Sequence, residues 1–166
     1  MQQPMQVLTS QATQEWYTPP HIIERARTLL GQIDLDPCTA ELPQTWIKAT
    51  TYYTLNKPAT GPWYGKVWLN PPFDDAASWI NNLEKRFLSA GVTEAVAIVN
   101  SALGYKWYEE LWRNFPVCCL RERLCFVNEQ GKTGGQAKKG QTIVYMGYNY
   151  RAFQDYFSDL GRILIP

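Results

Sequence analysis

The stretch Asn70-Pro71-Pro72-Phe73 contains the residue types in this sequence that are best suited to chemistry. The side-chain carbonyl of Asn70 accepts a hydrogen bond, and the carbonyl of the proline that follows accepts another. Two acceptors held by a rigid proline turn match the two N–H donors of a flat amino group. When both hydrogens are accepted, electron density moves onto the nitrogen and its lone pair is exposed for attack on an electrophile. Phe73 adds an aromatic face on which a planar ring can stack.

This turn is therefore suited to hold the exocyclic amine of a base, or an amide. The alternative is structural, because two prolines in a row also simply end a strand. A second turn of the same kind, Asp36-Pro37-Cys38, follows the apolar residues Ile33 and Leu35. Ligands of an open α/β sheet bind at the carboxyl ends of its strands, so both turns are candidate binding sites. For Asp36 the alternative is a carboxylate that only caps a turn or a helix.

Basic residues gather in one part of the chain. The segment from Arg121 to Lys139 has five basic and two acidic residues, a local charge of +3, whereas the whole chain has a net charge of +1. Three lysines in its Gly-rich portion, Lys132, Lys138 and Lys139, are predicted to contact phosphates. The alternative is a solvated, charged surface without a partner.

Helical and strand patterns alternate around these turns. Thr18 is expected to cap a helix that has Pro19 and Pro20 in its first turn and ends at Gly31. Further helices are expected over 74–91, 105–115 and 151–161, and strands over 33–35, 66–69, 94–100, 117–128 (one long or two short) and 141–148. Residues 46–65 have no assignable pattern, and 129–140 are expected to be a flexible loop. The alternation predicts an α/β sheet with helices on both faces and a C-terminal, hairpin-like antiparallel pair of strands that brackets the lysine-rich loop.

Length and composition limit the possible classes of protein. A chain of 166 residues is typical of one domain, expected here over 15–166 behind a loose, flexible arm of residues 1–14. The arm lacks the apolar run of a secretory signal, and no apolar stretch approaches membrane-spanning length. Four cysteines without a C-x-x-C pair and a single His21 make a poor set of metal ligands, so we expect no metal site. Reduced thiols in a cytoplasmic protein are the simpler interpretation.

The ordered set of motifs resembles a known family. Asn70-Pro71-Pro72-Phe73 is similar to the (Asp/Asn)-Pro-Pro-(Tyr/Phe) motif of S-adenosylmethionine-dependent amino-methyltransferases. The chain specifically resembles the small phage-type DNA adenine methyltransferases, the Dam family. The other residues that carry this resemblance, in family order from residue 15 to about 160, are Trp16, Thr18 and Pro19, then Asp36, Pro37 and Cys38, then Trp63 and Gly65, then Trp107, and finally Arg123, Leu124 and Phe126.

The resemblance implies a Rossmann-like methyltransferase sheet, reduced in size, with S-adenosylmethionine as cofactor and double-stranded DNA as partner. It implies that a flipped adenine is held by Asn70 and the Pro71 carbonyl, with Pro72 completing the turn and Phe73 stacking on the base. It also implies a cofactor site made by the turn at Asp36, Pro37 and Cys38 together with the opening motif, Trp16, Thr18 and Pro19. Trp16 would lie beside the positive sulfonium, with core packing as the alternative.

The chain departs from the family pattern in three respects. The segment after Asp36 contains no glycine, and no acidic residue lies between Glu41 and Asp74 to hold the cofactor ribose. Only 33 residues separate Asp36 from Asn70, which implies trimmed helices. There is no room for a separate target-recognition domain, so loops, the arm or the second subunit of a homodimer must read the DNA.

Two alternatives remain open at this stage. One is a methyltransferase for another planar amine, such as the cytosine amino group, a ribosomal RNA base or a protein glutamine. The other is an inactive methyltransferase-fold module that binds DNA or a protein partner without turnover. Binding of S-adenosylmethionine separates an enzyme from such a module.

Overall fold

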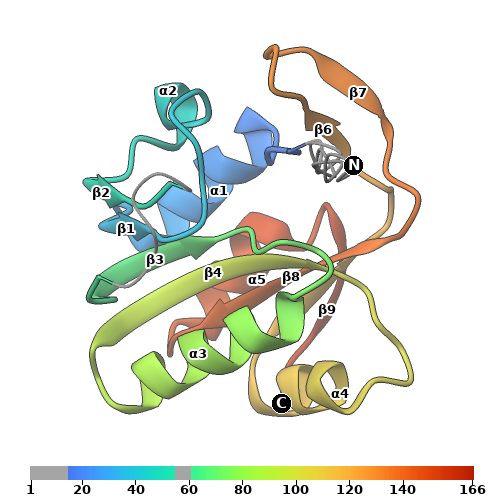
Figure 1. Ribbon diagram of the computed structural model, residues 1–166. Helices are drawn as coiled ribbons and strands as arrows, with labels where there is room; N and C mark the ends of the chain where they lie inside the picture. The colour runs from blue at the N-terminus through green and yellow to red at the C-terminus, as the bar shows by residue number, and fades with distance from the viewer. Residues whose placement is uncertain (1–14, 55–60) are drawn as a thin grey trace, which may run out of the picture.

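A mixed β-sheet runs through the molecule in the order β2-β1-β3-β4-β8-β5-β9 (Figure 1). The structure is a computed structural model that describes residues 15–54 and 61–166, so the expected arm, residues 1–14, lies outside the described residues. Its strands are β1 (Leu35–Asp36), β2 (Thr51–Tyr52), β3 (Gly65–Leu69), β4 (Val92–Asn100), β5 (Val117–Leu120), β8 (Gln141–Met146) and β9 (Gly161–Leu164). The first four strands in this spatial order are parallel, β8 is antiparallel to both of its neighbours, and β9 is antiparallel to β5.

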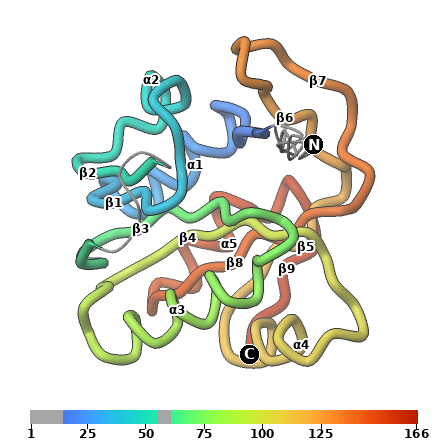
Figure 2. The backbone as a smooth tube through the Cα atoms, in the orientation of Figure 1, coloured from blue at the N-terminus to red at the C-terminus, as the bar shows by residue number. Residues whose placement is uncertain are grey.

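Helices cover both faces of this sheet, as predicted (Figures 1 and 2). The helices are α1 (Pro20–Leu30), α2 (Gln44–Ile47), α3 (Ala76–Leu88), α4 (Lys106–Asn114) and α5 (Tyr150–Phe157). On β3, Val67 and Leu69 pack in the core under α3 and α4, whereas Trp68 packs in the core under α1 and α5. This alternation is the period of two that a strand buried on both faces requires. Among the described residues, no helix has both the length and the apolar character needed to cross a membrane.

The start of α1 differs from the expectation. Pro19 occupies the cap position and Pro20 the first helical position, and no side chain caps the helix. The prediction that Thr18 caps it is wrong, because the helix begins one residue too late for Thr18 to reach its free N–H groups. The end is as predicted: Gly31 has a positive φ of 82° and its N–H bonds to the Arg27 carbonyl at 2.7 Å.

A small second sheet projects from the main one. It pairs β6 (Cys125–Val127) with β7 (Thr133–Gln136) in an antiparallel hairpin. The expected antiparallel pair is present as β5 and β8, and this hairpin lies between them in the chain. The segment 117–128 therefore forms two short strands. The expectation of a flexible loop over 129–140 is wrong for residues 133–136, because these glycine-containing residues complete the hydrogen bonds of β6.

Two strands were not anticipated. β2 consists of two residues inside the stretch that has no assignable pattern, and β9 follows the last helix. Gly161 explains how β9 comes so close to β5, because a Cβ on this residue would lie 2.1 Å from the Cys119 carbonyl oxygen. Such close approach is a requirement of tertiary packing and leaves no periodic pattern in the sequence.

Candidate active site

The two turns singled out in the sequence lie at adjacent strand ends. β1 pairs with β3 in parallel, with Leu35 opposite Val67. The chain leaves β1 to form β2 on one side, whereas β3 lies on the other side. This is the switch point at which open α/β sheets bind their ligands. The structure therefore brings the Asp36–Cys38 turn and the Asn70–Phe73 turn to the same edge of the sheet.

Asn70 has a free acceptor in a buried position. Its Nδ2 donates to the Trp16 carbonyl at 3.2 Å, and its Oδ1 is buried without a hydrogen-bond partner. Because a carbonyl can only accept, Trp16 determines which end of the amide is the donor. A buried polar atom without a partner is costly and rare, and this one belongs to the turn that follows β3. The amide is thus oriented with its nitrogen bonded to Trp16 and its oxygen left without a hydrogen bond.

Phe73 lies at the exposed side of the same turn. About 41% of its surface is accessible, and its ring meets Phe126 of β6 edge to face, with centroids 5.7 Å apart and planes at 73°. The contact fixes the ring against the hairpin while leaving aromatic surface open to solvent. An exposed ring that is held in this way can stack on a planar ligand.

The opening motif is held between the hairpin and α2. The backbone of Tyr17 exchanges two hydrogen bonds with Val127 of β6, at 2.8 and 2.9 Å, and the Trp46 indole donates to the Thr18 carbonyl at 3.0 Å. The Trp16 ring lies against Gly134 of β7, where a Cβ would be 2.6 Å from the indole. The Thr18 hydroxyl is buried and has no hydrogen-bond partner. Asn70 is thus bonded to the Trp16 backbone two residues before Thr18, and each of the two side chains, Asn70 and Thr18, keeps one unpaired oxygen.

Asp36 belongs to a buried network behind its turn. It is 1% exposed, its Oδ2 accepts from Gln44 Nε2 at 2.8 Å, and its Oδ1 accepts from the Cys38 N–H at 3.4 Å. Burial raises the pKa of Asp36 to about 7, against the hydrogen bonds that lower it. Gln44 also accepts from the Ala49 N–H at 3.1 Å, so Asp36 orders the whole segment from β1 through α2.

Cys38, in the same turn, is a neutral thiol. Burial raises the pKa of Cys38 to about 12, with a further contribution from the nearby Asp36 carboxylate. Since the thiolate is the reactive form, this cysteine is inert as a nucleophile near neutral pH. Its thiol packs at the margin of the core under α3. The chemistry of the turn therefore comes from its backbone and shape.

The structure supplies a carboxylate near β2 that sequence reasoning missed. The Tyr52 hydroxyl donates to Glu41 Oε2, which raises the pKa of Tyr52. Glu41 lies in the connection between β1 and α2, yet this bond places it beside the carboxyl end of β2. No pattern in the sequence indicates this position, because Glu41 comes from the loop before α2 and reaches β2 only through a tertiary contact.

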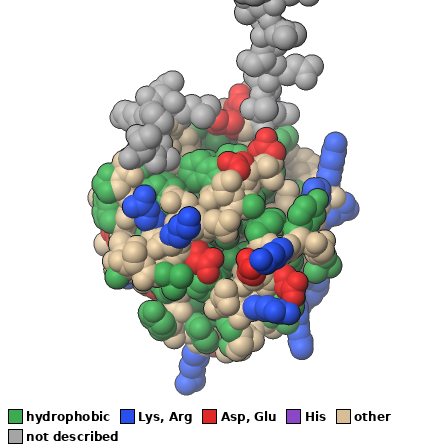
Figure 3. Space-filling view, turned by 60° about the horizontal axis from the view of Figure 1, so that its bottom comes forward, with side chains coloured by type: hydrophobic (Ala, Val, Ile, Leu, Met, Phe, Trp, Pro, Cys, Tyr) green, Lys and Arg blue, Asp and Glu red, His purple; other side chains and the backbone are tan. Residues whose placement is uncertain are grey.

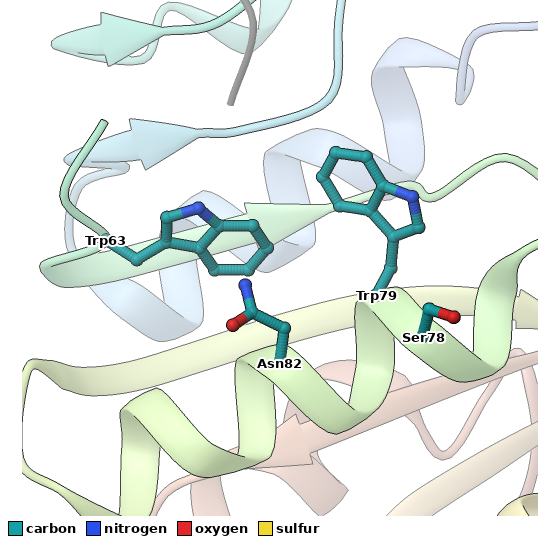
Figure 4. Close-up of a pocket in the computed structure, with 4 residues that line it drawn as sticks. All are labelled: Trp63, Ser78, Trp79 and Asn82. Atoms are coloured by element: carbon teal, nitrogen blue, oxygen red, sulfur yellow. The ribbon is translucent and has the colours of Figure 1, made fainter. Parts of the chain in front are cut away.

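An aromatic groove of about 230 Å³ opens over α3 (Figure 4). Its lining residues are Trp63, Ser78, Trp79 and Asn82. The two indoles stand side by side with centroids 5.8 Å apart and planes tilted by 33°, and Asn82 presents its amide next to them. Trp63 belongs to the core cluster against which Cys38 also packs. The groove therefore lies on the face of the sheet that α3 covers, with Trp63 just before the amino end of β3.

The three lysines are exposed but are not brought together. Lys132 lies in the turn between β6 and β7, whereas Lys138 and Lys139 follow β7 at the base of the hairpin. Within residues 15–54 and 61–166 none of the three forms an ion pair. Lys138 and Lys139 thus form a separate basic pair next to β8.

Several of the other residues that carry the family resemblance have structural roles. Gly65 has a positive φ of 65°, and a Cβ there would lie 2.4 Å from the Asp34 carboxylate. Trp107 packs against the core under α4, with its ring edge-on to Tyr108 at 5.8 Å. Phe126 is buried and supports Phe73, so it acts on the site indirectly.

Comparison with known proteins gives one family. The family model described as DNA N-6-adenine-methyltransferase (Dam) matches residues 6–159, which covers most of the chain and all of the turns and lysines described above. No curated protein sequence matches the chain.

Proposed function

The chain belongs to the DNA N-6-adenine-methyltransferase (Dam) family, and we propose that it transfers a methyl group from S-adenosylmethionine to the amino group of adenine in DNA. The observation that carries this proposal is the buried, unpaired Oδ1 of Asn70. An acceptor in this state is explained by a ligand N–H group. Asn70 follows β3 at the switch point of the sheet, where ligands of open α/β sheets bind.

The two acceptors of the turn would hold the amino group. Among the described residues no backbone N–H reaches the Pro71 carbonyl, whereas the Pro72 carbonyl accepts from Asp75 at 3.1 Å. Asn70 Oδ1 and the Pro71 oxygen would each accept one hydrogen of the amino group, which turns its lone pair toward the electrophile. S-adenosylmethionine supplies the methyl group on a positively charged sulfonium. The protein therefore contributes mainly orientation and lone-pair exposure.

The residues around the turn fit the cofactor. The Thr18 hydroxyl is buried without a partner and can bond to a polar group of the amino-acid part. The Trp16 indole offers a face that attracts a cation. Glu41, beside the end of β2, can accept from ribose hydroxyls, and the Trp63 and Trp79 groove offers indole rings against which a purine could pack. In this proposal Pro19 and Pro37 shape the cofactor site, and the buried Asp36 positions it.

DNA would approach the same edge of the sheet. The base must leave the stack to reach Asn70, as base-modifying enzymes require, and Phe73 would then stack on it. Lys132, Lys138 and Lys139 would contact phosphates and set the position of the duplex without reading its sequence. The exposed, unpaired state of these lysines supports this role.

The decisive experiment is mass spectrometry of nucleosides from the DNA of cells that express the chain. We expect 6-methyladenine to appear with the wild-type chain and to be absent with Asn70→Ala. The two acceptors match any amino group, so 4-methylcytosine would retain the mechanism and overturn the choice of base. Unmodified DNA, together with purified protein that does not bind S-adenosylmethionine, would instead establish a binding module.

A further inference from the structure

The loop after β4 presents two large apolar side chains to solvent. Leu103 is 83% exposed and Tyr105 is 64% exposed. Gly104, between them, has a φ of 89°, and the Tyr105 N–H bonds to the Ala102 carbonyl at 3.1 Å. A Cβ on Gly104 would meet no heavy atom within 4 Å, so the glycine is required by the backbone conformation of this tight turn. The turn thus holds both side chains away from the core.

This loop stands beyond the catalytic turn on the same edge of the sheet. Leu69, the last residue of β3, pairs with Ala97, and β4 continues for three more residues to Asn100. At about 3.3 Å per residue, the end of β4 projects about 10 Å beyond the end of β3. β4 therefore ends farther out than β3 at this edge, and the loop that carries Leu103 and Tyr105 begins there before it turns toward α4 (Figure 1).

The basic pair of the β7 and β8 connection lies directly beside this loop. The Ser101 N–H bonds to the Gly140 carbonyl at 2.9 Å, and Lys138 and Lys139 immediately precede Gly140. Figure 2 shows that the two connections leave the sheet together on the right of the molecule, from where one rises toward β7 and the other descends toward α4. The loop with the two apolar side chains and the segment with the two exposed lysines thus meet at Ser101 and Gly140, and together we call them the rim.

Two other surfaces formed by the described residues lack this combination. Seen from the side of α3 and α4, acidic and basic side chains are intermixed (Figure 3), and α4 pairs its own charges as Lys106 with Glu110 and Arg113 with Glu109. Two further exposed apolar residues, Leu88 and Tyr148, lie at the opposite edge of the sheet, beyond the start of β4 and the end of β8. They provide matched controls for the rim.

We propose that Leu103 and Tyr105 form a wedge that enters the base stack of duplex DNA and fills the gap left by the flipped nucleotide. Apolar wedges between base steps are a general device of proteins that distort DNA, and the neighbouring lysines would hold the flanking phosphates. Filling the gap offsets the lost stacking that opposes flipping. This inference rests on the proposed methylation of DNA, and it assigns the flipping step to residues outside the catalytic turn.

The test uses binding, which requires neither turnover nor knowledge of the target sequence. Duplexes with one abasic site already contain a gap, so a wedge should bind them more tightly than intact duplexes of the same sequence. We expect a preference of at least about fivefold for the wild-type chain. The Leu103→Ser, Tyr105→Ser double variant should lose it, whereas the Leu103→Met, Tyr105→Phe variant and the Leu88→Ser, Tyr148→Ser control should keep it.

A second measurement compares methylation of the same DNA in native and heat-denatured form. The wedge double variant should lose at least about tenfold in rate on duplex DNA and stay within about twofold of wild type on single strands. A wild-type chain without preference for abasic sites, or a variant that retains that preference, would overturn the wedge. A chain that shows the preference but methylates neither form of DNA would leave the wedge intact and overturn the proposed function.

Discussion

Replacing Asn70 by alanine distinguishes a catalytic role from a structural one. We expect a small change in the free energy of unfolding and a large loss in the rate of methyl transfer. The variant loses the hydrogen bond from Nδ2 to the Trp16 carbonyl, which costs about 1 kcal/mol. It also removes the buried, unpaired Oδ1, whose burial costs the folded protein about 1–3 kcal/mol. These contributions oppose each other. We therefore expect the free energy of unfolding to change by less than about 2 kcal/mol.

The rate of methyl transfer should respond far more strongly. If the Asn70 oxygen binds the amino group most tightly in the transition state, its loss resembles the loss of one oxyanion-hole donor, at least about a hundredfold in kcat. Each tenfold step corresponds to about 1.4 kcal/mol, so this is nearly 3 kcal/mol of transition-state stabilisation. Initial rates with labelled S-adenosylmethionine and saturating DNA measure it.

Urea unfolding of the same preparations gives the stability, and Asn81→Ala, at an exposed position of α3, serves as the matched control. The control should leave both quantities unchanged. Wild-type turnover in Asn70→Ala would refute the assignment of the acceptor. A loss of unfolding free energy above about 3 kcal/mol would show that the amide is a structural element of the turn.

Further predictions concern the lysines, the packing under the opening motif and the buried carboxylate. Joint replacement of Lys138 and Lys139 by glutamine should lower the slope of log affinity for DNA against log salt by about 2, with cofactor affinity unchanged in calorimetry. Gly134→Ala should weaken cofactor binding and cost about 1–3 kcal/mol, because its Cβ would lie 2.6 Å from an indole, whereas Gly135→Ala has free space and should be neutral in thermal unfolding. Burial raises the pKa of Asp36 from 3.8 to about 7, so between these values the folded chain holds a proton that the unfolded chain has lost. The free energy of unfolding should therefore fall by roughly 3 kcal/mol between pH 4 and 7, and Asp36→Asn should flatten this profile in urea titrations.

Much of the architecture could be derived from local pattern. The apolar period of α1 and α3, and the runs that became β3 and β4, predict helices on both faces of a sheet. Proline has a fixed φ and no N–H, so Asn70-Pro71-Pro72 ends β3 in any surrounding structure. Since both candidate turns follow strands, their meeting at one edge of a parallel sheet also follows from the sequence. These features depend on neighbours within a few residues.

The remaining features depend on residues that are distant in the sequence. Asn70 is oriented by the Trp16 carbonyl, 54 positions away, and no local pattern encodes that contact. No local pattern shows that Asp36 is buried and accepts a hydrogen bond from Gln44. The family resemblance predicts that Asp36 contacts the cofactor, whereas in the proposed site it positions the turn.

Strand pairing and register determined where the lysines and the exposed apolar side chains lie, which the periodicity of the sequence did not predict. The glycine-rich segment became β7 because β6 offered free hydrogen-bonding groups, and this separated Lys132 from Lys138 and Lys139. The exposure of Leu103 and Tyr105 likewise follows from the length by which β4 exceeds β3 and from the turn at Gly104. Sequence alone determined which chemical groups are present and at which strand ends they lie. Tertiary structure determined which of these groups remain unpaired, because their hydrogen-bond partners come from residues that are distant in the chain.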